Sequence, residues 1–145
     1  MTKNLTVFAD ILIDAPPAKV WEVLVTPRYV AQWDELPEDY PQEPMTVGSK
    51  VVWELPNGEQ SITTVSKADP ENELVIDLYG TAWKVTPEAG EVAYQYKLEK
   101  QDSQTLLNIR IGDFAIIENG EMYYAASVEF AEESKKTIKT LAEEL

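Results

Sequence analysis

Apolar and polar residues alternate along much of the middle of this chain. The clearest alternation runs from Val92 to Leu98, where every second residue is apolar or aromatic and most residues between them are polar. A period of two is typical of a β-strand with one buried and one wet face. The same pattern predicts a strand that ends at Ile13 and further strands over 50–55, 62–68, 74–78 and 107–111, with a short one over 81–85.

Tight-turn signals separate these strands. Asn57-Gly58 suits backbone positions with positive φ, and further turns are expected at 69–72, 87–90 and 101–103. Short turns join neighbouring antiparallel strands, whereas parallel strands need long crossover connections. The middle of the chain therefore predicts an antiparallel meander.

Two short helices are predicted between residues 13 and 33. Pro16 and Pro17 end the first strand, and the fixed φ of proline suits the first turn of a helix. Thr26 is expected to be the N-cap of the second helix, with Pro27 at its first position. The apolar residues at helical spacing are Val20, Trp21 and Leu24, followed by Tyr29, Val30 and Trp33. A loop rich in proline and acidic residues follows Trp33.

From about Glu121 to Leu145 the apolar period becomes helical. At 1.5 Å per residue this helix would be about 37 Å long, enough to cross a whole sheet. Small residues in the middle of its inward face either let the helix pack closely or leave room for a ligand, and we favour room for a ligand. The stripe predicted to face inward is Tyr124, Val128, Ala131, Ile138, Leu141, Ala142 and Leu145, and the small inward residues are Ser127, Ala131 and Ser134.

The composition excludes several kinds of chemistry. The 145 residues include no cysteine and no histidine, which excludes disulfides, thiolate nucleophiles, His-based triads and His-ligated zinc or haem. The net charge of −14 repels nucleic acid and anionic lipid surfaces. We expect no metal site and no cofactor. The acidic cluster of Asp34, Glu35, Glu38 and Asp39 is expected to be a solvated face.

The chain shows no run of about 18 apolar residues that could span a membrane. Its first ten residues lack the apolar core of a signal peptide. With no cysteine as well, a cytoplasmic location is expected.

The elements in this order resemble the helix-grip fold of the START-like superfamily, also called SRPBCC or birch-pollen-allergen-like. Within it, the chain resembles the branch named after activators of the heat-shock chaperone ATPase. The resemblance rests on I-x-A-P-P-x-x-V-W from Ile13 and on T-P with a later tryptophan over 26–33. It also rests on the Asp69-Pro70 turn before Leu74 and on T-L-L-x-I over 105–109.

The resemblance implies one α+β domain over residues 1–145. A curved antiparallel sheet would wrap around the long C-terminal helix, and the two short helices would close one end. A cavity between sheet and helix is implied, which in relatives holds lipids, polyketides or hormones. Fold alone does not fix function.

Aromatic residues with polar tips are candidates to line such a cavity, although each could equally belong to an ordinary core. The residues expected to line it are Trp33, Trp53, Tyr79, Trp83, Tyr94, Tyr96, Ile109, Phe114, Tyr124, Ser127, Ala131 and Ser134. Asp113 is the one weak catalytic candidate. It falls in register with the inward residues of the last strand and could act as an acid or base there, or a strand end could turn it outward.

Three functions follow, in this order. The first is non-catalytic binding of a small apolar or amphipathic molecule. The second is a protein-interaction module that resembles the chaperone-ATPase activators, with a heat-shock chaperone as partner. The third is an enzyme that resembles the polyketide cyclases or aromatases of the superfamily. No nucleotide-binding loop and no G-x-S-x-G serine is present, so an enzyme is the less expected outcome.

Overall fold

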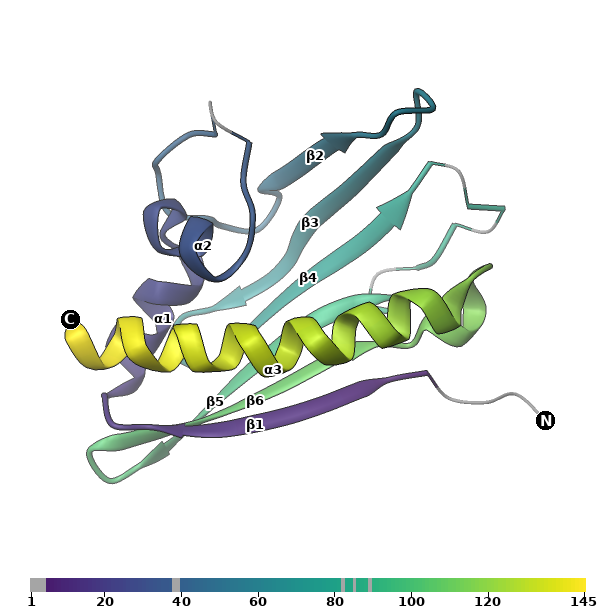
Figure 1. Ribbon diagram of the computed structural model, residues 1–145. Coiled ribbons are helices and arrows are strands. Elements are labelled where there is room, and N and C mark those ends of the chain that lie inside the picture. Colours follow the sequence, from purple (N-terminus) through teal and green to yellow (C-terminus); the bar gives the residue numbers. More distant parts are fainter. Residues whose placement is uncertain (1–4, 38–39, 82, 85, 89) are drawn as a thin grey trace.

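One antiparallel sheet forms a full layer of the molecule (Figure 1). The computed structural model describes residues 5–37, 40–81, 83–84, 86–88 and 90–145. Within these residues the sheet has six strands in the order β1-β6-β5-β4-β3-β2. The strands are β1 (Val7–Ile13), β2 (Lys50–Glu54), β3 (Gln60–Asp69), β4 (Glu73–Gly80), β5 (Ala93–Gln101) and β6 (Gln104–Gly112).

The alternation of apolar residues is confirmed on the central strands. Leu107, Ile109 and Ile111 of β6 are buried, and Tyr96 of β5 is 1% exposed. The short strand expected over 81–85 is wrong where the structure describes it. Trp83 and its described neighbours form a turn after β4, in which the Trp83 N–H donates to the carbonyl of Gly80 at 3.0 Å. Ala82 and Val85 lie outside the described residues.

Proline begins both of the short helices, as expected. The helices are α1 (Pro17–Val25) and α2 (Pro27–Trp33), followed later by the short 3-10 helix η1 (Phe114–Ile116) and the long α3 (Gly120–Glu144). Thr26 occupies the N-cap position of α2, but its side chain makes no capping hydrogen bond. Its backbone N–H instead donates to the Glu22 carbonyl at 3.0 Å, which ends α1. None of the described helices combines the length and apolarity needed to cross a membrane.

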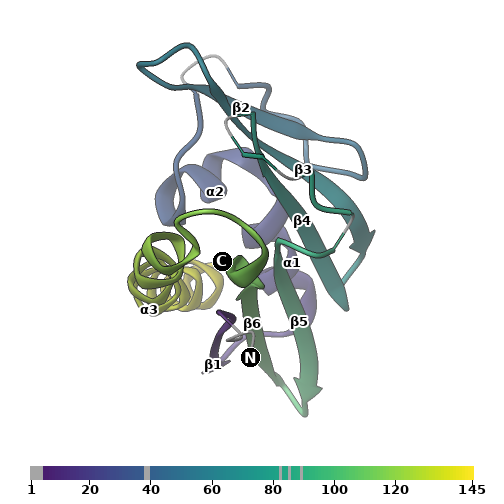
Figure 2. The same ribbon diagram turned by 90° about the vertical axis from the view of Figure 1, so that its right-hand side faces the viewer.

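The position of α3 divides the sheet into two unequal halves. Figure 2 shows α3 beside β1 and β6, while β2, β3 and β4 extend away from it. The contacts of α3 are mainly with β1, α1 and α2. The half of the sheet built from β2 to β4 therefore faces α2 and the loop after it, across a cavity described below, rather than the long helix.

The buried face of α3 is narrower than the sequence predicts. Its buried residues are Gly120, Ser127, Ala131, Ser134, Ile138 and Ala142. The prediction that Val128 and Leu145 face inward is wrong, because Val128 is 39% exposed and Leu145 is 36% exposed. Since α3 lies over one side of the sheet, only a strip of small side chains and Ile138 fits against it.

Candidate ligand-binding site

A cavity of about 150 Å³ lies between α2, the loop after α2, and strands β2 to β5. Leu24, Val30 and Trp33 form its helical side, and the loop contributes Asp34, Glu35 and several residues up to Ser49. The strands supply the floor. The floor residues are Val51 and Trp53 of β2, Ser61, Thr63 and Val65 of β3, Ile76 and Leu78 of β4, and Tyr94 and Tyr96 of β5.

Successive side chains of a strand point to opposite faces of the sheet, so these alternate residues lie together on the face that forms the floor. Thr63 pairs with Val51 on one neighbouring strand and with Leu78 on the other, so the three side chains form a row across the floor. The loop returns over this row because the Met45 N–H donates to the carbonyl of Val25 at 2.8 Å. The floor and the roof are thus set by sheet pairing and by one loop-to-helix hydrogen bond.

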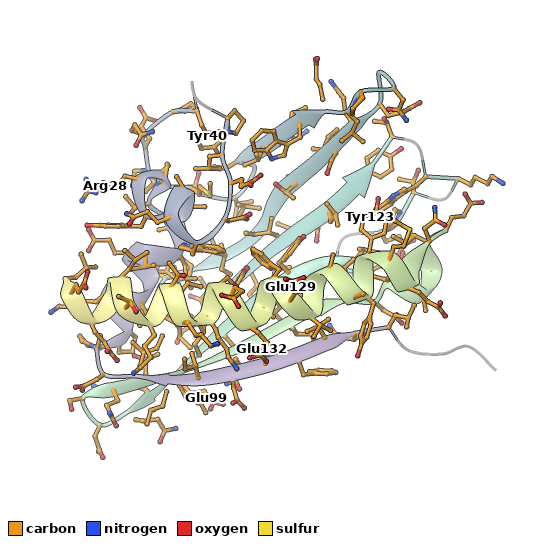
Figure 3. All side chains as sticks on the ribbon, viewed as in Figure 1. Arg28, Tyr40, Glu99, Tyr123, Glu129 and Glu132 are labelled. Atoms are coloured by element: carbon orange, nitrogen blue, oxygen red, sulfur yellow. The ribbon has the colours of Figure 1, made fainter. Side chains whose placement is uncertain are left out.

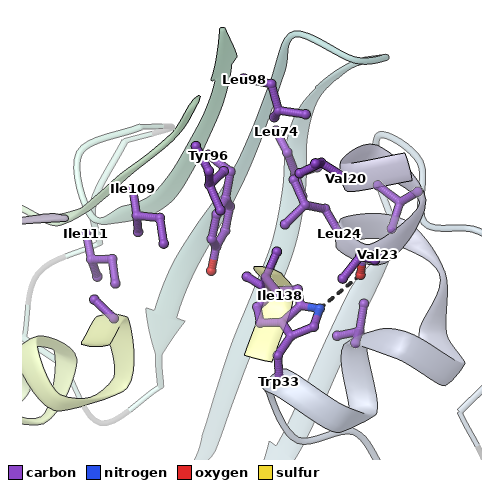
Figure 4. Packing of buried hydrophobic residues seen from close by; sticks show 14 of the residues in the cluster. Val20, Val23, Leu24, Trp33, Leu74, Tyr96, Leu98, Ile109, Ile111 and Ile138 are labelled. Carbon is purple, nitrogen blue, oxygen red and sulfur yellow. Dashed lines mark hydrogen bonds between the residues drawn. The ribbon is translucent and has the colours of Figure 1, made fainter. Parts of the chain in front are cut away.

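Trp33 fixes the aromatic end of the cavity. Its indole N–H donates to the carbonyl of Val23 at 2.9 Å, the dashed line in Figure 4. Its ring meets Tyr96 edge-to-face with centroids 5.7 Å apart, and Phe130 of α3 lies 6.5 Å from it. Phe130 also contacts Tyr94 edge-to-face at 5.9 Å. This network holds the rings of α2 and β5 in fixed positions.

Two carboxylates make another part of the cavity lining polar and acidic. Asp34 follows α2 directly, and its Oδ1 accepts a hydrogen bond from the Glu35 N–H at 2.8 Å. The Asp34 side chain keeps solvent-accessible surface because it lines the open cavity, yet the surrounding protein raises its pKa to about 6 by desolvation. Burial, and then the negative charge of Asp34, raise the pKa of Tyr94 and of Tyr96.

Four of the expected cavity residues do line the cavity, namely Trp33, Trp53, Tyr94 and Tyr96. The others lie elsewhere. Tyr79, Trp83 and Phe114 belong to a second aromatic cluster around Tyr123, with ring centroids 5.7 to 6.0 Å apart. Figure 3 shows Tyr123 near the start of α3 and Tyr40, a cavity residue, near α2.

The cavity is not where the resemblance implied. It was expected between the sheet and the C-terminal helix, but no α3 residue lines the aromatic cavity described above. A second, more open pocket of about 550 Å³ lies beside Glu132 and Lys135 of α3 and includes Ile109. The helix α3 packs along one side of the sheet. The expected cavity residues on this side are buried, namely Ile109, Ser127, Ala131 and Ser134, and Tyr124 is half-buried. The physical reason is that small side chains let α3 approach closely, which closes the space under its middle.

Asp113 lies outside the cavity and ties two backbone segments together. Its Oδ1 accepts hydrogen bonds from the N–H groups of Leu5 and Ala115, each at 2.9 Å, so it caps η1. A carboxylate engaged in this way positions the chain before α3. Within the described residues, no cluster of His, Cys, Asp or Glu side chains could hold a metal ion.

The solvated character expected for the acidic cluster is confirmed for Asp34 and Glu35, which are both exposed, but their place in the cavity lining was missed. Asp34 and Glu35 were expected in a solvated acidic face, and Glu38 and Asp39 of that face lie outside the described residues. The available signal was their place immediately after Trp33, at the end of a helix whose apolar face was already assigned. Ser61 and Thr63 were also missed, although they alternate in register with Val65.

Removal of the Asp34 charge is expected to stabilise the protein in a pH-dependent way. Because its folded-state pKa of about 6 exceeds the ordinary 3.8, the folded protein binds a proton more tightly than the unfolded chain between these values. Stability therefore falls as pH rises through this window. The full difference would correspond to about 3 kcal/mol, and the accessible surface of the carboxyl group reduces the expected effect to on the order of 1 kcal/mol.

Urea unfolding of Asp34→Asn at several pH values measures this effect. The variant should be more stable than the wild type at pH 7 and equal to it below the window. Glu43→Gln, in the same loop but outside the cavity lining, is the control and should stay within about 0.5 kcal/mol of the wild type throughout. A constant difference at all pH values would contradict the assignment.

Solved structures share this fold. The Mesorhizobium loti protein MLL2253 is 16% identical with a TM-score of 0.71, covering 96% of this chain and 97% of its own. The Aha1 protein of Colwellia psychrerythraea, described as a dimer, is 18% identical with a TM-score of 0.64. The alignment covers 92% of this chain and 96% of the Aha1 chain. DynU16, from the dynemicin biosynthetic locus, is 20% identical with a TM-score of 0.66, covering 95% of this chain and 47% of its own. These similarities establish the fold.

No curated protein matches the sequence. The sequence model of the family described as "Activator of Hsp90 ATPase homolog 1-like protein" matches residues 14–145. The match begins directly after β1 and includes both short helices, the other five strands and α3. The chain therefore belongs to the family of activator of Hsp90 ATPase homolog 1-like proteins.

Proposed function

We propose that this protein binds a small hydrophobic or amphipathic molecule in the cavity between α2, its following loop and strands β2 to β5. The carrying observation is an aromatic-lined, partly open cavity of about 150 Å³ on a fold that binds ligands in cavities. Hydroxyl groups of Ser49, Ser61 and Thr63 on its wall could orient the ligand.

The volume limits the ligand. An apolar cavity of about 150 Å³ accepts benzene, whereas drug-sized ligands occupy roughly 300–1,000 Å³. The cavity therefore suits a molecule of one ring, or one end of a longer molecule whose remainder stays in solvent. A steroid or a polycyclic polyketide would be too large for it to enclose.

The indole N–H signals of the four tryptophans test whether a ligand binds in the cavity. Trp33 and Trp53 line the cavity, whereas Trp21 and Trp83 do not. Titration of ¹⁵N-labelled protein with single-ring aromatic compounds should shift the indole signals of Trp33 and Trp53 with one common affinity and leave the other two in place. Equal shifts at all four indoles would indicate nonspecific association, and no saturable shift would refute binding.

Filling the cavity is expected to abolish binding without harming the fold. In Thr63→Phe the new ring and the ligand compete for one volume, so affinity should fall by at least about tenfold. Stability should stay level or rise by about 0.5–2 kcal/mol, as in other cavity-filling substitutions. Thr64→Phe, on the opposite face of the same strand, is the control and should keep binding. Calorimetric titration and thermal melts measure both effects.

A protein-interaction module is the second candidate, supported by family membership alone. Recovery of the heat-shock chaperone of the same cell by the immobilised protein would support it, and failure at high concentration would count against it. An enzyme stays third, and Asp34 would then be a better acid or base than Asp113, because it lines the cavity with a raised pKa.

We propose that residues 1–145 form one domain, because the described elements share one sheet and one core. We also propose a cytoplasmic location, because a chain without cysteine needs no oxidising compartment.

A further inference from the structure

We infer that the cavity selects a ligand with a positively charged nitrogen, held between the carboxylates of Asp34 and Glu35 and the aromatic wall of Trp33 and Tyr96. This inference rests on the proposed binding function and specifies its ligand class. It predicts an aromatic or aliphatic amine, or the amine end of a larger molecule.

The charges of the lining have one sign. Asp34 and Glu35 are its only charged residues among those described, and no lysine or arginine lines the cavity with them. The described ion pairs of the chain join other residues, so neither carboxylate is paired with a described cation. Both residues are exposed, so their carboxylates lie where the cavity meets solvent, and a bound cation would pair with them there.

The aromatic wall favours the same kind of ligand. The faces of tryptophan and tyrosine rings attract cations, most strongly where water is excluded. Trp33 is 5% exposed and Tyr96 is 1% exposed, and their edge-to-face contact fixes both rings. Trp53 and Tyr94 add two further rings to the wall. Aromatic rings and carboxylates together are typical of sites for ammonium groups.

The hydroxyl group of Tyr96 adds a polar atom to the aromatic side of the cavity. In Figure 4 its ring extends from β5 with the hydroxyl group at the far end. The Tyr96 side chain is almost wholly buried and lines the cavity, but its hydroxyl oxygen is not one of the enclosed polar atoms without a partner, which among the described residues are Thr6 Oγ1 and Ser134 Oγ. Buried tyrosine hydroxyls usually have a partner. An ammonium N–H could donate to this oxygen.

Ligands of other charge would fit less well. An anion would meet two carboxylates at short range, and the net charge of −14 would already slow its approach. A neutral ring could fill the apolar part but would leave both carboxylates without a counter-charge. The overall charge instead raises the local concentration of cations.

Three probes of one ring size test the inference at neutral pH by calorimetric titration. They are benzylammonium, benzyl alcohol and benzoate. Benzylammonium is expected to bind about tenfold more tightly than benzyl alcohol, and benzoate more weakly than either. Asp34→Asn should remove most of this preference and Glu35→Gln part of it. The matched control is Glu43→Gln, which removes the same charge from the same loop outside the cavity lining and should keep the preference.

The outcomes separate the two proposals. Equal affinity for benzyl alcohol and benzylammonium, or a preference that survives in the double variant of Asp34→Asn and Glu35→Gln, would overturn the cationic ligand and leave the binding function standing. Absence of binding for all three probes would overturn both. A preference lost in the double variant and kept in Glu43→Gln would support both.

Discussion

Substitution of Trp33 by alanine is expected to lower the free energy of unfolding by about 3–5 kcal/mol. The indole ring is 5% exposed and packs against Tyr96 and Phe130, so its removal leaves a void between α2 and β5. The carbonyl of Val23 also loses its hydrogen bond from the indole N–H. Urea unfolding followed by circular dichroism measures the loss as a lower midpoint.

Trp53→Ala is the matched control for this result. Trp53 also lines the cavity, but it lies on the edge strand β2 and is 37% exposed. Its loss should therefore lower stability by less than about 1 kcal/mol while still weakening ligand binding. Equal destabilisation by both substitutions would contradict the view that Trp33 supports the core and Trp53 only the cavity.

The second large effect is expected at Gly120, where α3 begins. A methyl group at this position would lie 2.0 Å from the carbonyl oxygen of Phe114, a backbone atom that cannot turn away. Alanine normally favours a helix over glycine, but here the clash would push the first turn of α3 off η1. Gly120→Ala should lower the free energy of unfolding by about 2–3 kcal/mol, measured by the same urea unfolding.

Gly58→Ala separates this clash from the general effect of replacing glycine. A methyl group at Gly58 would meet no atom within 4 Å, and only its φ of +86° is unfavourable for alanine. The expected loss is about 1 kcal/mol. A Gly120→Ala variant as stable as the wild type would contradict the close approach of η1 and α3.

Most of the fold could be predicted because its signals are local. The alternation around Tyr96, the turn at Asn57-Gly58 and the prolines that begin α1 and α2 each act within a few residues. The failures come from packing between elements that are far apart in the sequence. Val128 belongs to a helical stripe by spacing but is exposed, because the width of the buried strip depends on what α3 packs against.

The position of the cavity could not be predicted, because it depends on where α3 lies across the sheet. Trp83 and Trp53 are both aromatic residues of the β-rich half of the sequence, and spacing alone gives them the same role. In the structure Trp83 joins the cluster around Tyr123, while Trp53 lines the cavity. The cavity role of Asp34 was missed for a similar reason, since only the return of the loop, through Met45, places this exposed acid in a cavity lining.

The location of a bound ligand tests the central claim most directly. Isotope-filtered nuclear Overhauser measurements on the protein saturated with benzylammonium, or with benzyl alcohol if that binds more tightly, report which protons contact the probe. Contacts with the Trp53 ring and with the methyl groups of Val51 and Leu78 are the expected result. Contacts with Ala131 or with the Tyr123 cluster, and none with the β2 to β4 residues, would contradict the account.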